Sequence, residues 1–207
     1  MPAIVVVGAQ WGDEGKGKVV DLLAEQANFV VRYAGGNNAG HSVVNDYGSF
    51  KLHLVPAGIF HKDCVCIIGN GVVVTPEDLL DELESLRAAK VPIDHLFISE
   101  RAHLVMPYHI LLDSLEEQAR GGGAIGTTLK GIGPAYMDKM ARVGIRIGDL
   151  HHPGLFKERL QHNLAEKRAQ FPDNPALAGL QLDAIYTEHL KHYERIRHFS
   201  VDSAQIL

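Results

Sequence analysis

Cysteine, long apolar runs and excess positive charge are all scarce in this sequence. Two cysteines among 207 residues cannot form the disulfide framework of a small secreted protein. No apolar segment approaches the roughly 20 residues that a membrane-spanning helix needs, and the N-terminus lacks the basic region and long apolar stretch of a signal peptide. The formal net charge of −5 does not fit the basic surface of a nucleic-acid-binding domain. We therefore expect a cytoplasmic protein that binds neither membrane nor nucleic acid.

The two cysteines predict no special chemistry. Cys64 and Cys66 flank Val65 in an apolar run, so both thiols would lie on the same face of a strand. We expect two small buried hydrophobic residues. The alternative, a redox or metal pair, lacks the second cysteine pair that would complete a metal site.

The composition is that of a globular protein with unevenly distributed glycine. Hydrophobic residues make up 46% and charged residues 22%, which argues against disorder and against a fibrous chain. The length suits one ordinary domain or part of a larger one. The 21 glycines are about one residue in ten, against a usual value of about 7%, and they gather in a few segments.

Strand and helix patterns alternate along the first hundred residues. Apolar runs at 4–7, 29–33, 65–68 and 96–98 predict strands, and a turn between apolar residues at 43–55 predicts a hairpin. Continuous apolar strands separated by helices indicate a parallel sheet buried on both faces. The predicted fold class is therefore α/β and P-loop-like, with a mainly parallel central sheet flanked by helices, a small inserted β-hairpin and a helical C-terminal segment.

The predicted helices have apolar stripes at helical spacing. One helix, at 19–26, carries Val19, Leu22 and Leu23 on one face. Another is capped by Thr75, with Pro76 in its first position. Its apolar stripe is Leu79, Leu80, Leu83 and Leu86. After residue 151 the pattern is helical, with a break at 171–175. The stripes there are Leu155, Phe156, Leu160 and Leu164, then Ile185, Tyr186, Leu190, Tyr193 and Ile196.

The domain organisation follows from these patterns. We expect residues 1–207 to be the N-terminal part of a single larger α/β domain, with a nucleotide-binding core at 1–150 and a helical segment at 151–207. The last residues, 204–207, carry no stop signal, which favours a truncated chain over a complete protein whose last helix ends there. His189 and His192 lie three residues apart without a carboxylate or thiol to complete a zinc set, and we expect them at the surface.

The strongest motif is the glycine-rich sequence GAQWGDEGKGK at 8–18. It lies between a predicted strand and a predicted helix, where backbone amides and the helix N-terminus favour a bound phosphate. The pattern departs from the standard P-loop, because Gly17 stands where a Ser or Thr normally contacts Mg²⁺. Asp13 is then the obvious oxygen donor for a metal. The alternative is a glycine-rich surface turn with solvated charges.

Two further segments carry polar side chains on flexible backbone. The sequence RYAGGNNAGHS at 32–42 follows a strand, at the edge where open α/β sheets bind ligands. There His41 and Asp13 could face one substrate and handle protons, although a single histidine is more often structural. The segment 121–133 holds six glycines and predicts a mobile loop. Its hydroxyls and lysines, together with Arg142, suit a phosphomonoester, and the alternative is a disordered loop.

The three segments together resemble the adenylosuccinate synthetase family. The octapeptide WGDEGKGK at 11–18 is similar to the family's signature, and 35–41 and 126–136 are similar to further blocks in the same order. The resemblance covers residues 1 to about 150 well and the helical tail only loosely. It implies a GTP-dependent C–N ligase of purine nucleotide biosynthesis, which joins IMP and L-aspartate to adenylosuccinate on the way to AMP and releases GDP and phosphate.

The resemblance also implies roles for individual residues. Asp13 would be the base, His41 the acid and Lys16 a further catalytic cation. One Mg²⁺ per subunit would be held by Asp13 and Gly40, and a homodimer would share Arg142 across its interface. Ser42 stands where many members carry Thr. The GTP-binding positions are Gly12, Asp13, Glu14, Gly15, Lys16, Gly17, Lys18, Gly40, His41 and Ser42. The IMP-binding positions are Asp13, Asn38, Ala39, Gly40, His41, Thr128 and Arg142.

Two other functions are compatible with the residues. One is a P-loop GTP-binding module without ligase activity, although such a switch needs neither the Asp13 and His41 pair nor the phosphate-type loop at Thr128. The other is a catalytically incomplete fragment, because family members continue well beyond residue 207 and carry their aspartate-binding and guanine-specificity segments there. The sequence contains no Asn-Lys-x-Asp element, so GTP follows from the resemblance alone.

Overall fold

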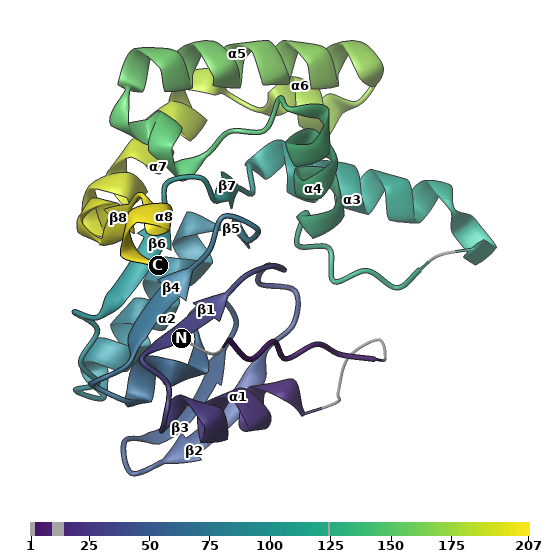
Figure 1. The fold of residues 1–207 in the computed structure, drawn as a ribbon. Coiled ribbons are helices and arrows are strands. Elements are labelled where there is room, and N and C mark those ends of the chain that lie inside the picture. The colour runs from purple at the N-terminus through teal and green to yellow at the C-terminus, as the bar shows by residue number, and fades with distance from the viewer. Residues whose placement is uncertain (1–2, 10–14, 124) are drawn as a thin grey trace.

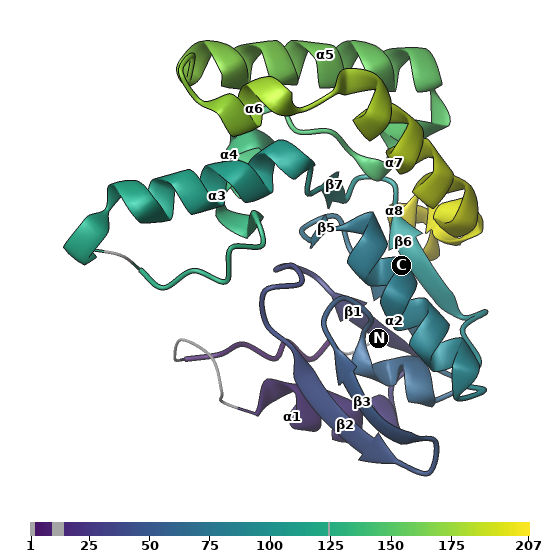
Figure 2. The same cartoon turned by 180° about the vertical axis from the view of Figure 1, so that it is seen from behind.

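The computed structural model describes residues 3–9, 15–123 and 125–207 (Figures 1 and 2). Its central sheet has four strands in the order β1 (Phe29–Arg32), β4 (Val65–Ile68), β6 (Leu96–Ser99) and β8 (Ser200–Val201). Every neighbouring pair is parallel, which confirms the predicted parallel sheet. Within these described residues no helix has the length and apolar character needed to cross a membrane.

The connections between the central strands carry two small sheets. Between β1 and β4 lies the predicted hairpin, in which β2 (His41–Asn45) pairs with β3 (Gly48–Leu52), followed by the 3₁₀ turn η1 (Ala57–Phe60). The short strands β5 (Val73–Val74) and β7 (His103–Leu104) pair in parallel after β4 and β6. The Asn45 side chain accepts a hydrogen bond from the Tyr47 amide at 3.0 Å, which closes the hairpin turn as an Asx turn.

The helices are unevenly distributed around the sheet. Helix α1 lies beside the hairpin at one end of the molecule, while α5, α6 and α7 lie together at the other (Figure 1). Helix α3, with the segment that follows it, projects from the body (Figure 2). The helical bounds are α1 (Lys16–Ala24), α2 (Pro76–Ala88), α3 (Pro107–Ala119), η2 (Gly121–Gly123), α4 (Ile132–Ala141), η3 (Ile147–His151), α5 (Pro153–Gln170), α6 (Pro175–Gly179), α7 (Leu182–Ile196), η4 (Arg197–Phe199) and α8 (Ser203–Ile206).

The core joins the sheet to α2 and to the C-terminal helices. The four leucines predicted for α2 are buried, as are Phe156, Leu160 and Leu164 of α5. The break at 171–175 separates α5 from α6 as predicted. Both cysteines are free and buried, and burial raises the pKa of the Cys64 and Cys66 thiols, so they behave as small hydrophobic residues.

Two predictions for the N-terminal region are wrong. Residues 4–7 form no strand, and Ile4, Val5 and Val7 are exposed. Apolar character alone does not make a strand, which also needs a hydrogen-bonded neighbour. Among the described residues β1 pairs with β4 alone, and residues 4–7 do not pair with its other edge. In α1 the helix begins at Lys16, earlier than expected. Its predicted stripe of Val19, Leu22 and Leu23 is exposed, because the helix packs through Val20 and Ala24 instead.

Further corrections concern single side chains. Thr75 occupies the N-cap position of α2, but its side chain makes no capping hydrogen bond. Leu155 is 38% exposed and lies off the buried face of α5. His189 is buried rather than at the surface, because it shares the inner face of α7 with Ile185 and Tyr193. Its ring nitrogen bonds the Ile185 carbonyl at 2.9 Å.

Candidate active site

The N-terminus of α1 has the arrangement of an anion-binding helix end. Gly15 precedes the helix in the left-handed region at φ 77°, which a residue with a side chain rarely adopts. Its carbonyl accepts from the amides of Lys18 at 3.0 Å and Val19 at 3.3 Å. The first amides of the helix and its dipole favour a negative ligand here. The predicted residues Gly12, Asp13 and Glu14 lie outside the described residues.

His41 lies directly against this helix end. A Cβ placed on Gly17 would come within 2.5 Å of the His41 Cβ, so only glycine permits this approach. Burial, reinforced by the positive charge of Arg32, lowers the pKa of His41. At neutral pH the imidazole is therefore uncharged. Its Nε2 is buried without a hydrogen-bond partner among the described residues, as expected of an atom that meets a ligand.

The segment between β1 and β2 is held at its base and exposed at its tip. Arg32 donates from Nη2 to the Gly36 carbonyl at 2.8 Å, and buried Asn37 donates from Nδ2 to Asp78 at the start of α2. The predicted residues Asn38, Ala39, Gly40 and Ser42 are exposed. Buried polar atoms without partners gather around this segment in the described part of the chain: Arg32 Nε, Asn37 Oδ1, His41 Nε2, His53 Nδ1 and Thr75 Oγ1.

The third predicted segment leads into α4 and is fixed by two carboxylates of α3. Glu117 accepts from the Gly126 amide at 2.5 Å, and backbone hydrogen bonds lower its pKa. Asp113 accepts from the Gly131 amide at 2.9 Å. Gly131 precedes α4 in the left-handed region. Thr128 is exposed between these two anchors, where its hydroxyl is open to a ligand.

The structure brings some predicted residues together and leaves others apart. Gly17 lies against His41. Asp78 of α2 bonds Asn37 of the second segment and lies 3.6 Å from Lys130 of the third, so the second and third segments are linked through α2. Arg142 lies at the opposite end of α4, exposed and left-handed at φ 65°. A ten-residue helix is about 15 Å long, so Arg142 is well separated from Thr128 within this chain.

Sequence reasoning missed the residues that join the segments. Tyr136 bonds three backbone groups of two different loops, and Asp78 bonds Asn37. The sequence places Asp78 in the first turn of a predicted helix, but it does not show that Asp78 pairs with Asn37, 41 residues away. Tyr136 lies in the segment 126–136 that resembles a family block, but no local signal shows that its partner is Gly35, 101 residues away.

The chemistry of the predicted donors, Asp13 and the Gly40 carbonyl, is compatible with Mg²⁺. No group of three or more His, Cys, Asp or Glu side chains that could hold a metal occurs among the described residues. Mg²⁺ prefers oxygen donors and is usually held by one or two carboxylates together with substrate phosphates. The Asp13 carboxylate and the Gly40 carbonyl are oxygen donors of this kind.

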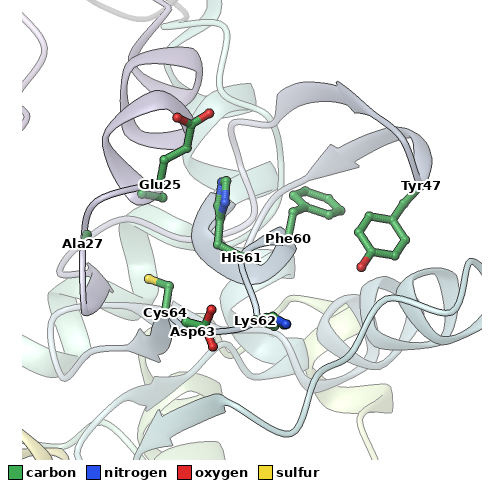
Figure 3. Close-up of a pocket in the computed structure, with 9 residues that line it drawn as sticks. Glu25, Ala27, Tyr47, Phe60, His61, Lys62, Asp63 and Cys64 are labelled. Atoms are coloured by element: carbon green, nitrogen blue, oxygen red, sulfur yellow. The ribbon is translucent and has the colours of Figure 1, made fainter.

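One surface pocket lies away from these residues (Figure 3). It has a volume of about 360 Å³ and is bounded by the end of α1, the hairpin turn at Tyr47 and the segment 60–64. His61 on its wall lies 3.5 Å from Asp21. None of the predicted ligand residues lines it, so it is not the site that the motifs indicate.

Comparison with known proteins shows the family to which the chain is similar. The adenylosuccinate synthetase family profile matches residues 5–207. The expectation that the helical tail is only loosely similar is therefore wrong, because the match extends through it. The adenylosuccinate synthetases of Enterococcus faecalis and Bacillus cytotoxicus are 52% and 51% identical over the whole chain. A fully ligated adenylosuccinate synthetase from Plasmodium falciparum superposes with a TM-score of 0.82, at 34% identity over 94% of this chain and 45% of its own.

A more distant structure shares part of the fold. The succinoaminodeoxyadenylate synthetase of cyanophage S-2L, bound to dGMP and dATP as an energy donor, gives a TM-score of 0.52 at 26% identity over 68% of this chain and 39% of its own.

The fold is that of a mixed α/β protein with a parallel central sheet and a small antiparallel hairpin. The chain belongs to the adenylosuccinate synthetase family. It spans about half the length of the curated relatives that it matches, 48% of the Enterococcus faecalis protein.

Proposed function

We propose that this chain is the N-terminal part of an enzyme that joins IMP and L-aspartate at the expense of GTP, giving adenylosuccinate, GDP and phosphate. The observation that carries the proposal is the position of His41, which lies against Gly17 in the first turn of a phosphate-type helix with its Nε2 buried and unpartnered. The family membership of the whole chain supports it. Residues 1–150 contribute the nucleotide and IMP core, and 151–207 a helical part of the same larger domain.

The reaction proceeds in two steps. Asp13 takes the N1 proton of IMP, and the 6-oxygen attacks the γ-phosphorus of GTP, so GDP leaves. The aspartate amino group then attacks C6, and the 6-oxygen leaves as part of inorganic phosphate. A carboxylate with an ordinary pKa near 3.9 is a weak base for this proton, so the first step depends on stabilising the charge that develops on oxygen.

The chain's own residues supply that stabilisation. His41 is neutral and donates from Nε2 toward the oxygen between the two reacting groups, where one well-placed donor contributes about 3–4 kcal/mol. Lys16 and the α1 amides hold the phosphates, with Gly12, Glu14, Gly15, Gly17, Lys18 and Ser42 beside them. Asp13 and the Gly40 carbonyl would hold one Mg²⁺ per subunit, which neutralises phosphate charge when bound. Asn38, Ala39 and Thr128 bind IMP.

Arg142 acts in the site of a second subunit of a homodimer. Its exposure at the end of α4 remote from Thr128 supports this assignment. The two free thiols and the acidic composition support a cytoplasmic protein with no nucleic-acid or membrane partner.

The proposal is tested by product formation in the protein as its gene encodes it. Adenylosuccinate is followed chromatographically after addition of IMP, aspartate, Mg²⁺ and GTP. Product formed equally well with ATP, or without aspartate, would refute the assignment. Asp13→Asn and His41→Asn should each lower turnover by about 10²-fold or more. His61→Asn, at the remote pocket, is the matched histidine control and should stay within a few-fold of wild type.

The shared Arg142 is tested by mixing two inactive variants. In a mixed dimer of Asp13→Ala and Arg142→Leu, one site loses both residues while the other keeps its own Asp13 and receives an intact Arg142. With free exchange about half the dimers are mixed, so activity should recover to roughly a quarter of wild type. If subunit exchange is shown by mass labelling and no activity returns, Arg142 does not act across the interface.

A further inference from the structure

Two candidate ligand segments are joined through a single tyrosine hydroxyl. Tyr136, on α4, accepts a hydrogen bond from the Gly35 amide at 2.7 Å. Its hydroxyl lies 2.7 Å from the Gly71 carbonyl and 3.3 Å from the Gly35 carbonyl. The shorter distance favours donation to Gly71. One hydroxyl therefore satisfies a donor and an acceptor from the loops that follow β1 and β4.

The backbone around this hydroxyl is closely packed. The Gly35 carbonyl accepts from the Val73 amide at 2.9 Å. A Cβ on Gly36 would lie 2.5 Å from the Ile132 Cδ1 and 3.1 Å from the Val73 carbonyl oxygen. The base of the 35–41 segment is thus pressed against the first turn of α4, and a displacement of either element would be transmitted to the other.

A second bridge joins the same two segments independently. Asp78, in the first turn of α2, accepts from the Asn37 side chain and lies 3.6 Å from the Lys130 ammonium group. Asn37 is 4% exposed, whereas Lys130 is largely exposed, so the Asn37 contact is the firmer of the two. Asp78 therefore lies between a residue that precedes Asn38 and a residue that follows Thr128.

We propose that Tyr136 and Asp78 are positioning residues that hold the segment 35–41 and the segment 126–136 in one fixed relation, so that Asn38 and Thr128 meet the same ligand. Neither residue touches the ligand. The identity of the ligand as IMP rests on the proposed function, but the mechanical coupling does not. In this account the loop after β1 takes its position from a helix a hundred residues away.

The coupling is tested with Tyr136→Phe in the protein as its gene encodes it. The variant keeps the ring and removes both hydrogen bonds, leaving the Gly35 amide and the Gly71 carbonyl without a partner. Amide hydrogen exchange, read by mass spectrometry without ligand, should accelerate about tenfold in peptides covering 33–38 and 69–73. Tyr193→Phe, a buried tyrosine of α7 whose ring packs against His151, is the matched control and should leave both peptides unchanged. Asp78→Ala, which removes the acceptor of the Asn37 side chain, should accelerate exchange at 36–38.

Binding then separates positioning from general destabilisation. Calorimetric titration should show IMP affinity reduced about tenfold in Tyr136→Phe, with GTP affinity reduced less than threefold, since only the IMP positions lie on both segments. Unchanged exchange in both peptides would overturn the coupling, and unchanged IMP affinity with accelerated exchange would overturn the positioning role. If wild-type protein binds no IMP, the proposed function fails while the exchange result still decides the coupling.

Discussion

A buried ionic group joins α3, α4 and α5, and its removal gives the sharpest stability prediction. Asp138 of α4 accepts from His109 of α3 at 3.0 Å and from Lys167 of α5 at 2.5 Å. The Asp138 and His109 side chains are only 4% and 1% exposed. These contacts hold together the three helices around the end of α4 that carries Arg142.

The protonation states in this group follow from its hydrogen bonds. The Met106 amide donates to His109 Nδ1 at 2.9 Å, so the ring proton is on Nε2 and is donated to Asp138. Burial lowers the pKa of His109, which keeps the ring neutral. Burial opposes ionisation of Asp138, but the hydrogen bonds from His109 and Lys167 outweigh it, and its pKa lies below the ordinary value.

Asp138→Asn removes the charge and keeps the shape. The amide can accept one of the two hydrogen bonds, and it leaves the Lys167 ammonium, 12% exposed, without its counter-charge. Hydrogen bonds to charged groups contribute about 1.5–3 kcal/mol each, and breaking a buried pair costs about 3–5 kcal/mol. We expect the free energy of unfolding to fall by about 3 kcal/mol at pH 7. Because the pKa of folded Asp138 is depressed, this stabilisation is present above the unfolded pKa near 3.9 and is lost as the pH falls through the folded pKa.

The assay is urea unfolding followed by circular dichroism at pH 7. Asp183→Asn is the matched control, because Asp183 also pairs with a lysine, Lys157 at 2.8 Å, but its side chain is 81% exposed. The control should show an unfolding midpoint close to wild type. An Asp138→Asn curve indistinguishable from that of Asp183→Asn would refute the reasoning.

Three other substitutions test a pH-dependent contribution to stability and the steric requirement for glycine. Burial lowers the pKa of His103 to about 4, so the free energy of unfolding of the wild type should fall as the pH drops from about 6.5 to 4. In His103→Gln the urea midpoints measured at these two pH values should differ less than in the wild type. An equal difference in the two proteins would contradict this prediction. A Cβ on Gly71 would lie 1.9 Å from the Tyr33 carbonyl oxygen, so Gly71→Ala should lower the free energy of unfolding by more than about 3 kcal/mol. A Cβ on Gly154 would have no atom within 4 Å. Because Gly154 lies in a helix, Gly154→Ala should raise the free energy of unfolding by about 0.5 kcal/mol. Equal thermal midpoints for the two alanine variants would contradict the steric argument.

The sequence predicts elements that are set by local patterns. Continuous apolar runs predict β4 and β6, and the leucine spacing predicts α2, because burial on one or both faces imposes those periods. Helices α3 and α4 were missed, although Pro107 stands at the first position of α3. The glycine-rich segment beside them indicated a loop, and α4 itself is stabilised by Asp113 and Tyr136 contacts rather than by its own pattern.

In the candidate site, too, some features follow from local sequence patterns and others depend on long-range contacts. The glycine-rich motif predicts a helix after 8–18, although the helix begins at Lys16 rather than at Val19. The predicted strand before the motif is absent. The bridges at Asp78 and Tyr136 join residues 41 to 101 positions apart, which no local pattern reports. The neutral state of His41 depends on its burial and on the charge of Arg32, and burial is set by the fold rather than by a local pattern. The prediction of a strand at 4–7 was wrong for a related reason. A strand must pair with another strand, and the four residues themselves do not show whether such a partner exists.

The proposal that the 6-oxygen of IMP attacks the γ-phosphorus of GTP and leaves as part of the phosphate is tested most directly by following that oxygen. IMP labelled with ¹⁸O at position 6 is incubated with GTP, Mg²⁺ and aspartate and the protein as its gene encodes it. The released phosphate is then analysed by mass spectrometry. The account predicts one ¹⁸O atom in each phosphate formed, because the bond from C6 to oxygen breaks when aspartate displaces the phosphoryl group. Adenylosuccinate formed together with unlabelled phosphate would contradict it.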